Sequence, residues 1–235
     1  MTDPEQIRAR LHALADAGRA AGAARYFKTG PGEYGAGDRF LGIRVPALRG
    51  VAREFRHAGA DAAAELLRSP WHEERLVALL LLIHAYDAAD EAGREATHRV
   101  YLDHTRFVNN WDLVDSSAPQ LVGRHLDGRD LGLLDTLAGS GLLWERRIAI
   151  VATQHFIRRN EFAPTLHVAA LLVNDPHDLI HKAVGWMLRE VGQRDRPAEE
   201  GFLREHCRAM PRTMLRYAVE HFPPEPRSSY MRGAV

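Results

Sequence analysis

The segment Asn109–Asp115, with the sequence NNWDLVD, holds the residue types best suited to chemistry in this chain. On a helix, Trp111 and Asp115 are four residues apart and share one face. Pro119 has no N–H to donate, so the carbonyl of Asp115 loses its helical partner and the helix kinks or ends there. A carboxylate beside an aromatic ring at a helix end suits the stabilisation of a developing positive charge. The same pattern equally fits a core tryptophan and an aspartate that caps a helix or pairs with an arginine.

Two further segments carry cations beside aromatic or polar groups. Lys182, Trp186 and Arg189 are spaced four and three residues apart, which predicts a cation–aromatic–cation stripe on one helix face. Such a stripe suits a phosphate backbone and a base or sugar face. The same residue types also occur where lysine and arginine stems only cover a half-buried tryptophan. In the other segment, Arg147 is followed by Gln154, His155 and Arg158.

Three other patterns give weaker hypotheses. His177 and His181 have the spacing of helical metal ligands, but no third ligand stands near them in the sequence, so no metal or other cofactor is expected. Gly30–Gly35 spells GxGxxG, yet no strand or βαβ unit is expected around it, and we interpret the segment as a flexible loop. The single cysteine, Cys207, excludes an internal disulfide, and the hydrolase motif GxSxG is absent.

The elements that must position these residues are helices. Apolar residues recur at three- and four-residue spacing, without convincing strand patterns, which predicts an all-α fold. An N-cap residue followed by proline predicts a helix start. The predicted starts are Asp3-Pro4, Ser69-Pro70 and Asp175-Pro176, and Pro46 after a loop that ends at Val45.

Several helices resemble one another, as the segments WHEERLVALLLLIHAY, WERRIAIVATQHFIRR and HDLIHKAVGWMLREVG illustrate. Aligning Arg75, Arg147 and Lys182 gives separations of 72 and 35 residues, which are two periods and one period of about 36. The helix that starts at Asn109 lies at the repeat position between those of Arg75 and Arg147. A period of this length is typical of helix pairs stacked into a curved solenoid with a concave face. A helical bundle without repeats is the simpler alternative.

Composition limits the class of protein. The 235 residues are 46% hydrophobic and 26% charged, which is ordinary for a globular chain. Basic and acidic residues balance at 31 each, so net charge neither supports nor excludes a nucleic-acid partner. The first residues lack the apolar core of a signal peptide, and the longest apolar run, Leu76–Ile83, is too short to span a bilayer. We expect a soluble, cytoplasmic, monomeric protein without a membrane partner. The expected single domain comprises N-terminal helices and a Gly-rich loop (1–45), repeat helices (46–222) and a C-terminal tail (223–235).

Five ordered segments between Ala24 and Phe222 resemble the AlkD-type DNA alkylation repair family. They are ARYFKTG with FLGIRVPALR, NNWDLVDSSAP, LLWERRIAI, HKAVGWMLRE and RTMLRYAVEHF. The resemblance implies an all-α fold of HEAT-like repeats stacked into a curved solenoid with a concave DNA-binding face. It also implies excision of cationic alkylated purines from double-stranded DNA, with an aspartate that stabilises an oxocarbenium-like sugar and positions water.

The resemblance assigns roles residue by residue. Asp115 falls on the catalytic aspartate. Trp111 and Trp186 fall on tryptophans that embrace the lesion nucleotide, and Arg147 on an arginine at the catalytic face. Val45 stands where the family has a hydroxyl residue, which puts one phosphate contact in doubt. The candidate DNA-contacting residues are Tyr26, Arg44, Arg49, His155 (in place of a lysine), Arg158, Lys182, Arg189 and Arg212.

Two alternatives to a glycosylase stay open from the sequence. A catalytically inactive helical-repeat protein would retain nucleic acid, with salt weakening the complex, but would release no base. A protein–protein scaffold would do neither.

Overall fold

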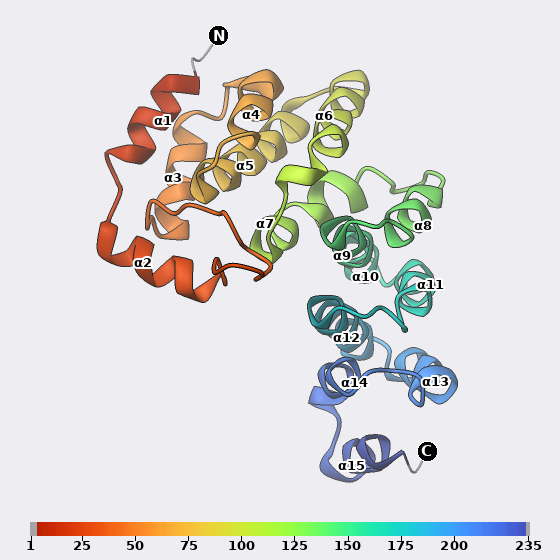
Figure 1. The fold of residues 1–235 in the computed structure, drawn as a ribbon. Helices are drawn as coiled ribbons and strands as arrows, with labels where there is room; N and C mark the ends of the chain where they lie inside the picture. Colours follow the sequence, from red (N-terminus) through yellow and green to blue (C-terminus); the bar gives the residue numbers. More distant parts are fainter. Residues whose placement is uncertain (1–3, 234–235) are drawn as a thin grey trace. The chain divides into compact units, whose positions relative to one another are not determined.

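The computed structural model describes residues 4–233, which form helices joined by turns and short loops (Figure 1). Within this range there is no strand, and an isolated bridge between Arg39 and Trp71 is the sole β-type pairing. The prediction of an all-α fold is confirmed. The chain divides into two compact units, Met1–Ser117 and Ala118–Val235. No helix of the described range combines the length and apolar character needed to cross a membrane.

In the first unit, α5 is the central helix. Its residues from Leu76 to Leu82 are almost all buried, because α3, α4 and α6 pack around it. A helix that is apolar on most of its circumference is stable only when it is enclosed in this way. The helices of this unit are α1 (Pro4–His12), α2 (Ala17–Tyr26), α3 (Val45–Glu54), α4 (Gly59–Leu67), α5 (His72–Ala88), α6 (Glu91–Asp103) and α7 (Trp111–Asp115).

The second unit consists of helix pairs stacked in sequence order, as Figure 1 shows. One row contains α9, α12 and α14, which contact one another in turn. The other helices, α8, α11 and α13, each pack against a member of that row. This arrangement confirms the predicted helical repeats. The bounds are α8 (Gly132–Ala138), α9 (Leu143–Ala152), α10 (Gln154–Arg158), α11 (Ala163–Leu171), α12 (Asp178–Gly192), α13 (Arg196–His206), α14 (Arg212–Ala218) and α15 (Pro224–Arg232), the last within the expected C-terminal tail.

Three repeat helices begin after the same kind of turn, in which a side-chain oxygen accepts a backbone N–H. The acceptor lies two residues before the donor in each case, so the turn forms before the helix and the helix starts later than predicted. The prediction that Ser69-Pro70 and Asp175-Pro176 are N-cap and first helical residue is therefore wrong. The bonds run from the Trp71 N–H to Ser69 Oγ (3.0 Å), the Leu142 N–H to Ser140 Oγ (3.0 Å) and the His177 N–H to Asp175 Oδ1 (2.8 Å).

A second bond of this turn fixes the register of the repeats. A side chain in the first turn of the helix donates back to the carbonyl of the turn residue. The sequence alignment through Arg147 and Lys182 is therefore one residue late in the second and third helices. The bonds run from Arg75 Nη1 to the Ser69 carbonyl (2.8 Å), Arg146 Nη1 to the Ser140 carbonyl (3.0 Å) and His181 Nε2 to the Asp175 carbonyl (2.5 Å).

The remaining helix starts and the Gly-rich loop differ little from expectation. Helix α1 begins at Pro4 as predicted, and Asp3 lies outside the described residues. Helix α3 begins at Val45, one residue before the predicted start at Pro46. The loop is anchored rather than only flexible: Gly35 is buried and its N–H donates to the Lys28 carbonyl at 3.0 Å.

Gly185 lies where α12 closely approaches α14, and its replacement by alanine should destabilise the protein by about 2 kcal/mol. A Cβ at this position of α12 would overlap the Met214 carbonyl oxygen and lie 2.6 Å from the Tyr217 Cβ of α14. Gly201 of α13 is the matched control, because a Cβ there would meet only the Arg204 side-chain end at 3.9 Å. Gly201→Ala should raise stability by about 0.5–1 kcal/mol through helix propensity. Urea unfolding of both variants measures this, and equal effects would contradict it.

Candidate active site

Helix α7 places Trp111 and Asp115 on a single turn. Asn110 precedes the helix, and its side-chain oxygen accepts the N–H of Trp111 at 2.9 Å. The helix ends at Asp115, as the position of Pro119 predicts. Both side chains are half-buried, so each retains a solvent-accessible part. The first unit thus presents a carboxylate and an indole ring from the same short helix.

A buried hydroxyl pair lies close to Asp115. The Tyr101 hydroxyl and Ser117 Oγ are 3.2 Å apart, and the Ser117 hydroxyl donates to the Leu113 carbonyl at 2.7 Å. Burial raises the pKa of Tyr101, and the negative charge of Asp115 acts in the same direction. The Tyr101 hydroxyl therefore stays protonated and neutral at neutral pH.

Aromatic rings from the α2 end and the following loop hold Trp111. Phe27 stacks on Trp111 with ring centroids 5.4 Å apart, and Tyr26 meets Trp111 edge-on at 6.0 Å. Phe27 also stacks on Phe40, at 5.2 Å. Tyr26 is 65% exposed, so this aromatic cluster continues from the core to the surface. Offset and edge-on ring pairs stabilise such clusters beyond their buried area.

A polar network joins the Gly-rich loop to α5 and α7. The carboxylate of Asp38, at the end of the loop, accepts from Arg75 Nη2 at 2.7 Å and from Asn109 Nδ2 at 2.9 Å. His72, the first residue of α5, lies 3.1 Å from Asp38 Oδ2 through Nδ1 and 2.7 Å from Asp112 Oδ2 through Nε2. These donors hold the pKa of Asp38 below its usual range although the group is largely buried.

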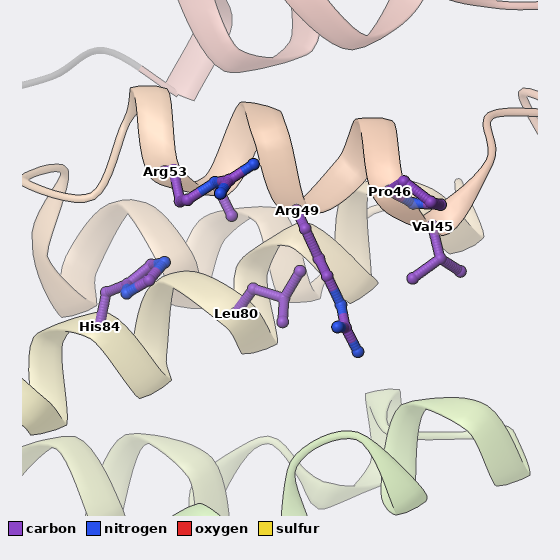
Figure 2. A pocket seen from close by; sticks show the side chains of 7 residues that line it. Val45, Pro46, Arg49, Arg53, Leu80 and His84 are labelled. Atoms are coloured by element: carbon purple, nitrogen blue, oxygen red, sulfur yellow. The ribbon is translucent and has the colours of Figure 1, made fainter.

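Arginine side chains of α3 line an open, mainly apolar pocket of the first unit, of about 400 Å³. Figure 2 shows Arg49 and Arg53 projecting from α3 over Leu80 and His84 of α5. Arg49 is exposed, and within residues 4–233 its guanidinium has no ion-pair partner. Arg44, at the N-cap position of α3, is likewise exposed. An exposed arginine without an ion-pair partner beside an open pocket suits an anionic ligand such as a phosphate.

In the second unit, Arg147 is a buried residue and Trp186 a half-buried one. Arg147 is 5% exposed, and its Nη1 donates to the Leu179 carbonyl at 2.7 Å in the first turn of α12. Trp186 lies two turns further along α12, where its indole N–H donates to Glu190 Oε1 at 3.2 Å. Arg147 therefore fixes the start of the helix that carries Trp186.

The cationic candidates of the second unit all have partners within it. Partnered cations remain free to exchange those bonds for phosphate contacts, since exposed ion pairs contribute little stability. The pairs are Lys182 with Asp178 (2.7 Å), Arg189 with Glu220, His155 with Asp127 (3.3 Å), Arg158 with Gln154 (2.9 Å) and Arg212 with the Met231 carbonyl.

The structure brings some predicted residues together and adds others. Tyr26, Trp111 and Asp115 lie in one aromatic and acidic region of the first unit, whereas Lys182, Trp186 and Arg189 share helix α12 in the second. The sequence analysis missed Phe27, Asp38, His72 and Asp112 as parts of the site, and Arg53 and His84 beside Arg49. The sole sequence signal for Asp38 is its place at the end of the Gly-rich loop. No three His, Cys, Asp or Glu side chains in the described range are grouped to hold a metal ion.

The fold and these residues define a helical-repeat protein with an acidic, aromatic turn in one unit and cationic helices in the other. The sequence matches the family of DNA alkylation repair enzymes over residues 7–222, and the chain belongs to that family. A solved structure described as a predicted DNA alkylation repair enzyme from Enterococcus faecalis shares the fold, with a TM-score of 0.69. It is 16% identical in sequence, and the similarity covers 90% of this chain and 98% of that one. No curated protein matches the sequence.

Proposed function

We propose that this protein is a DNA N-glycosylase that excises cationic alkylated purines of the 3-methyladenine and 7-methylguanine type. The observation that carries the proposal is the half-buried Asp115 at the end of α7, on the same turn as Trp111. Membership of the DNA alkylation repair enzyme family supports DNA as the partner. The substrate is then double-stranded DNA that contains an alkylated base.

Removal of a cationic purine needs a carboxylate to stabilise the sugar but no general acid to protonate the leaving base. Alkylation at N3 or N7 makes the purine cationic, so the base leaves with the electrons of the glycosidic bond and becomes neutral. The sugar becomes oxocarbenium-like, and an ionised carboxylate stabilises this charge. Water then forms the new bond to C1′, and its proton passes to the carboxylate or to solvent. At about 4 Å and an effective dielectric constant of about 20, one such charge pair contributes roughly 4 kcal/mol.

The aromatic residues contribute by a different interaction. The accessible part of the Trp111 ring, supported from behind by Phe27, offers a face to the cationic base or sugar. A cation over an indole face gains about 0.5–2 kcal/mol. The family resemblance assigns the same role to Trp186, which lies on the helix whose first turn accepts the bond from Arg147. These assignments are tested by replacing each tryptophan with alanine and with phenylalanine, which retains a ring face.

The direct test is release of free base from methylated duplex DNA, separated by chromatography. The wild-type protein should release 3-methyladenine and 7-methylguanine and leave abasic sites, with no release from unmethylated duplex. Retention of DNA without release of either base would indicate instead a nucleic-acid-binding relative without this activity. A protein that neither binds DNA nor releases a base would instead fit a protein–protein scaffold. Each of these two results would contradict the proposal.

Arg49→Ala should weaken binding to duplex DNA and lower the slope of log K against log salt by about one, because one phosphate contact is lost. The rate of base release at saturating DNA should stay unchanged, since Arg49 is assigned to the backbone. Arg99→Ala is the control: Arg99 is an exposed arginine of α6 with only a long 3.8 Å ion pair to Glu95. Fluorescence anisotropy at several salt concentrations measures both. An unchanged slope in Arg49→Ala removes Arg49 from the interface.

A further inference from the structure

Both ring nitrogens of His72 face carboxylates that come from different parts of the chain. Nδ1 lies 3.1 Å from Asp38 of the Gly-rich loop, and Nε2 lies 2.7 Å from Asp112 of α7. An ionised carboxylate only accepts hydrogen bonds, so each of these contacts requires an N–H on the imidazole. A neutral ring has one N–H and satisfies one contact. The geometry therefore calls for the doubly protonated imidazolium.

The surroundings of His72 contain groups that favour this charge and groups that oppose it. The ring is buried and stacks on Phe40, with centroids 4.6 Å apart, and it packs at a tilt against Phe27 at 5.0 Å. Burial lowers the pKa of His72 and the positive charge of Arg75 does the same, but the bonds to Asp112 and Asp38 outweigh both, so the pKa is raised.

Other charged groups lie near without bonding to the ring. Glu73, next to His72, is engaged by the N–H groups of Leu41, Gly42 and Ile43 at 2.7–3.2 Å. Arg19 and Arg44 line the small cavity, of about 190 Å³, that His72, Glu73 and Asp112 also border. The carboxylates that contact the imidazole are thus Asp38 and Asp112, and Arg75 neutralises only the far oxygen of Asp38.

The contacts of His72 converge on the helix that carries the proposed catalytic carboxylate. Asp112 is the second residue of α7, between Trp111 and Asp115. Asp38, on the opposite side of the imidazole, also binds Asn109 just before the helix. Phe27, which packs at a tilt against His72, also stacks on Trp111. Loss of the His72 charge would therefore remove the bond that ties Asp112 of α7 through the imidazole to Asp38 of the loop.

We propose that His72 is a positioning residue, an imidazolium held between Asp38 and Asp112 that fixes the orientation of α7 and so of Trp111 and Asp115. Its effect on base release rests on the proposed function, whereas the bridge itself does not. The same bridge assigns a structural role to the Gly-rich loop, because the end of the loop places Asp38 beside the imidazole. In this view Asp38, His72 and Asp112 act through α7 and do not touch the substrate.

The test uses the full-length protein and begins with the wild type, which needs no variant to fold. ¹⁵N NMR of the histidine side chains should show His72 as imidazolium at pH 7, where a histidine of ordinary pKa near 6.5 is mostly neutral. His72→Gln should then displace the indole N–H resonance of Trp111, identified by its loss in Trp111→Phe. His12→Gln is the matched control, because His12 lies at the end of α1 and pairs with a single carboxylate, Glu74, at 3.0 Å.

The rate of base release distinguishes a positioning role of His72 from a purely structural one. At saturating methylated DNA, His72→Gln should lower the single-turnover rate about tenfold or more, with little change in DNA affinity, because displacement of reacting groups acts on the chemical step. Asp112→Asn should act in the same direction, and His12→Gln should match the wild type. The wild-type rate should fall as pH rises above neutrality and His72 loses its charge, a decline that His72→Gln lacks.

Several results would overturn the bridge. They are a neutral His72 at pH 7, an unmoved Trp111 resonance in folded His72→Gln, or a rate in that variant equal to that of the wild type. If the wild type releases no base, the proposed function fails, and the two NMR measurements alone decide the bridge. If His72→Gln does not fold, the protonation state of wild-type His72 and the Trp111 resonance in Asp112→Asn decide it.

Discussion

Asp115→Asn is expected to lower the rate of base release about a thousandfold while DNA binding persists. The substitution keeps the size of the side chain and removes the negative charge at the end of α7. If the roughly 4 kcal/mol of charge stabilisation is realised only in the transition state, its loss corresponds to on the order of a thousandfold in rate. Binding should persist, because a carboxylate repels the phosphate backbone and its removal costs no favourable DNA contact. Single-turnover release of 7-methylguanine, beside anisotropy with the same duplex, measures both quantities.

Asp103→Asn provides the matched control for this variant. Asp103 is an exposed aspartate that ends α6 in the same unit, so its loss changes the net charge equally. It should release base at the wild-type rate. A rate loss shared by both variants would point to a general electrostatic effect. If Asp115→Asn releases base at the wild-type rate, Asp115 has no part in the mechanism, even though the protein is active.

Glu199→Gln is expected to raise the free energy of unfolding by on the order of 3 kcal/mol at pH 7. Glu199, in the first turn of α13, is 1% exposed and packs against Gly192 of α12. Its Oε1 finds no hydrogen-bond partner among the described residues. Burial raises the pKa of this carboxyl to about 8, although the charge of Arg196 acts to lower it. At pH 7 the folded protein therefore holds Glu199 protonated, whereas the unfolded chain ionises it.

The sign of the pH dependence follows from this difference. The folded state binds the proton more tightly than the unfolded state, so Glu199 destabilises the fold progressively as pH rises from about 4.5 to about 8. Glutamine keeps the shape and the neutral state at every pH. The gain from Glu199→Gln should thus be small at pH 4.5 and largest above pH 8. Urea unfolding across this range measures it.

Glu200→Gln is the control for the stability experiment. Glu200 is the neighbouring, partly exposed carboxylate of the same helix, and surface substitutions usually change stability by less than about 0.5 kcal/mol. A gain from Glu199→Gln that is equal at pH 4.5 and pH 8 would show that ionisation is not the cause. A loss of stability at pH 8 would show that the ionised carboxylate is tolerated where it lies.

The sequence by itself determined the local features. Helical spacing, together with Pro119, located a short helix that ends at Asp115 and carries Trp111 on the same turn. Lys182, Trp186 and Arg189 fall on α12 as their spacing predicts. The repeat period led to stacked helix pairs, which the second unit contains. These features depend on neighbours within one or two helical turns, and the sequence records such neighbours directly.

Where a helix begins was decided by turn geometry rather than by residue preference. Ser69 and Asp175 are good capping residues, yet the side-chain oxygen of each accepts a hydrogen bond within a turn that precedes the helix. The next turn then brings Arg75 or His181 back to the carbonyl of the same residue. The choice between a cap and a turn depends on which backbone donor the folded chain presents, so preference alone misplaced both starts by two residues.

Only the tertiary structure decided which groups meet across long separations. Asp38, His72 and Asp112 stand in a loop and two helices, and no spacing rule joins them. The burial of Arg147 and its bond to the Leu179 carbonyl likewise follow from the packing of α9 against α12. The physical reason is common to these cases. Burial and long-range hydrogen bonds depend on the packing of whole helices, whereas the pattern of a sequence reports only the faces that each helix offers.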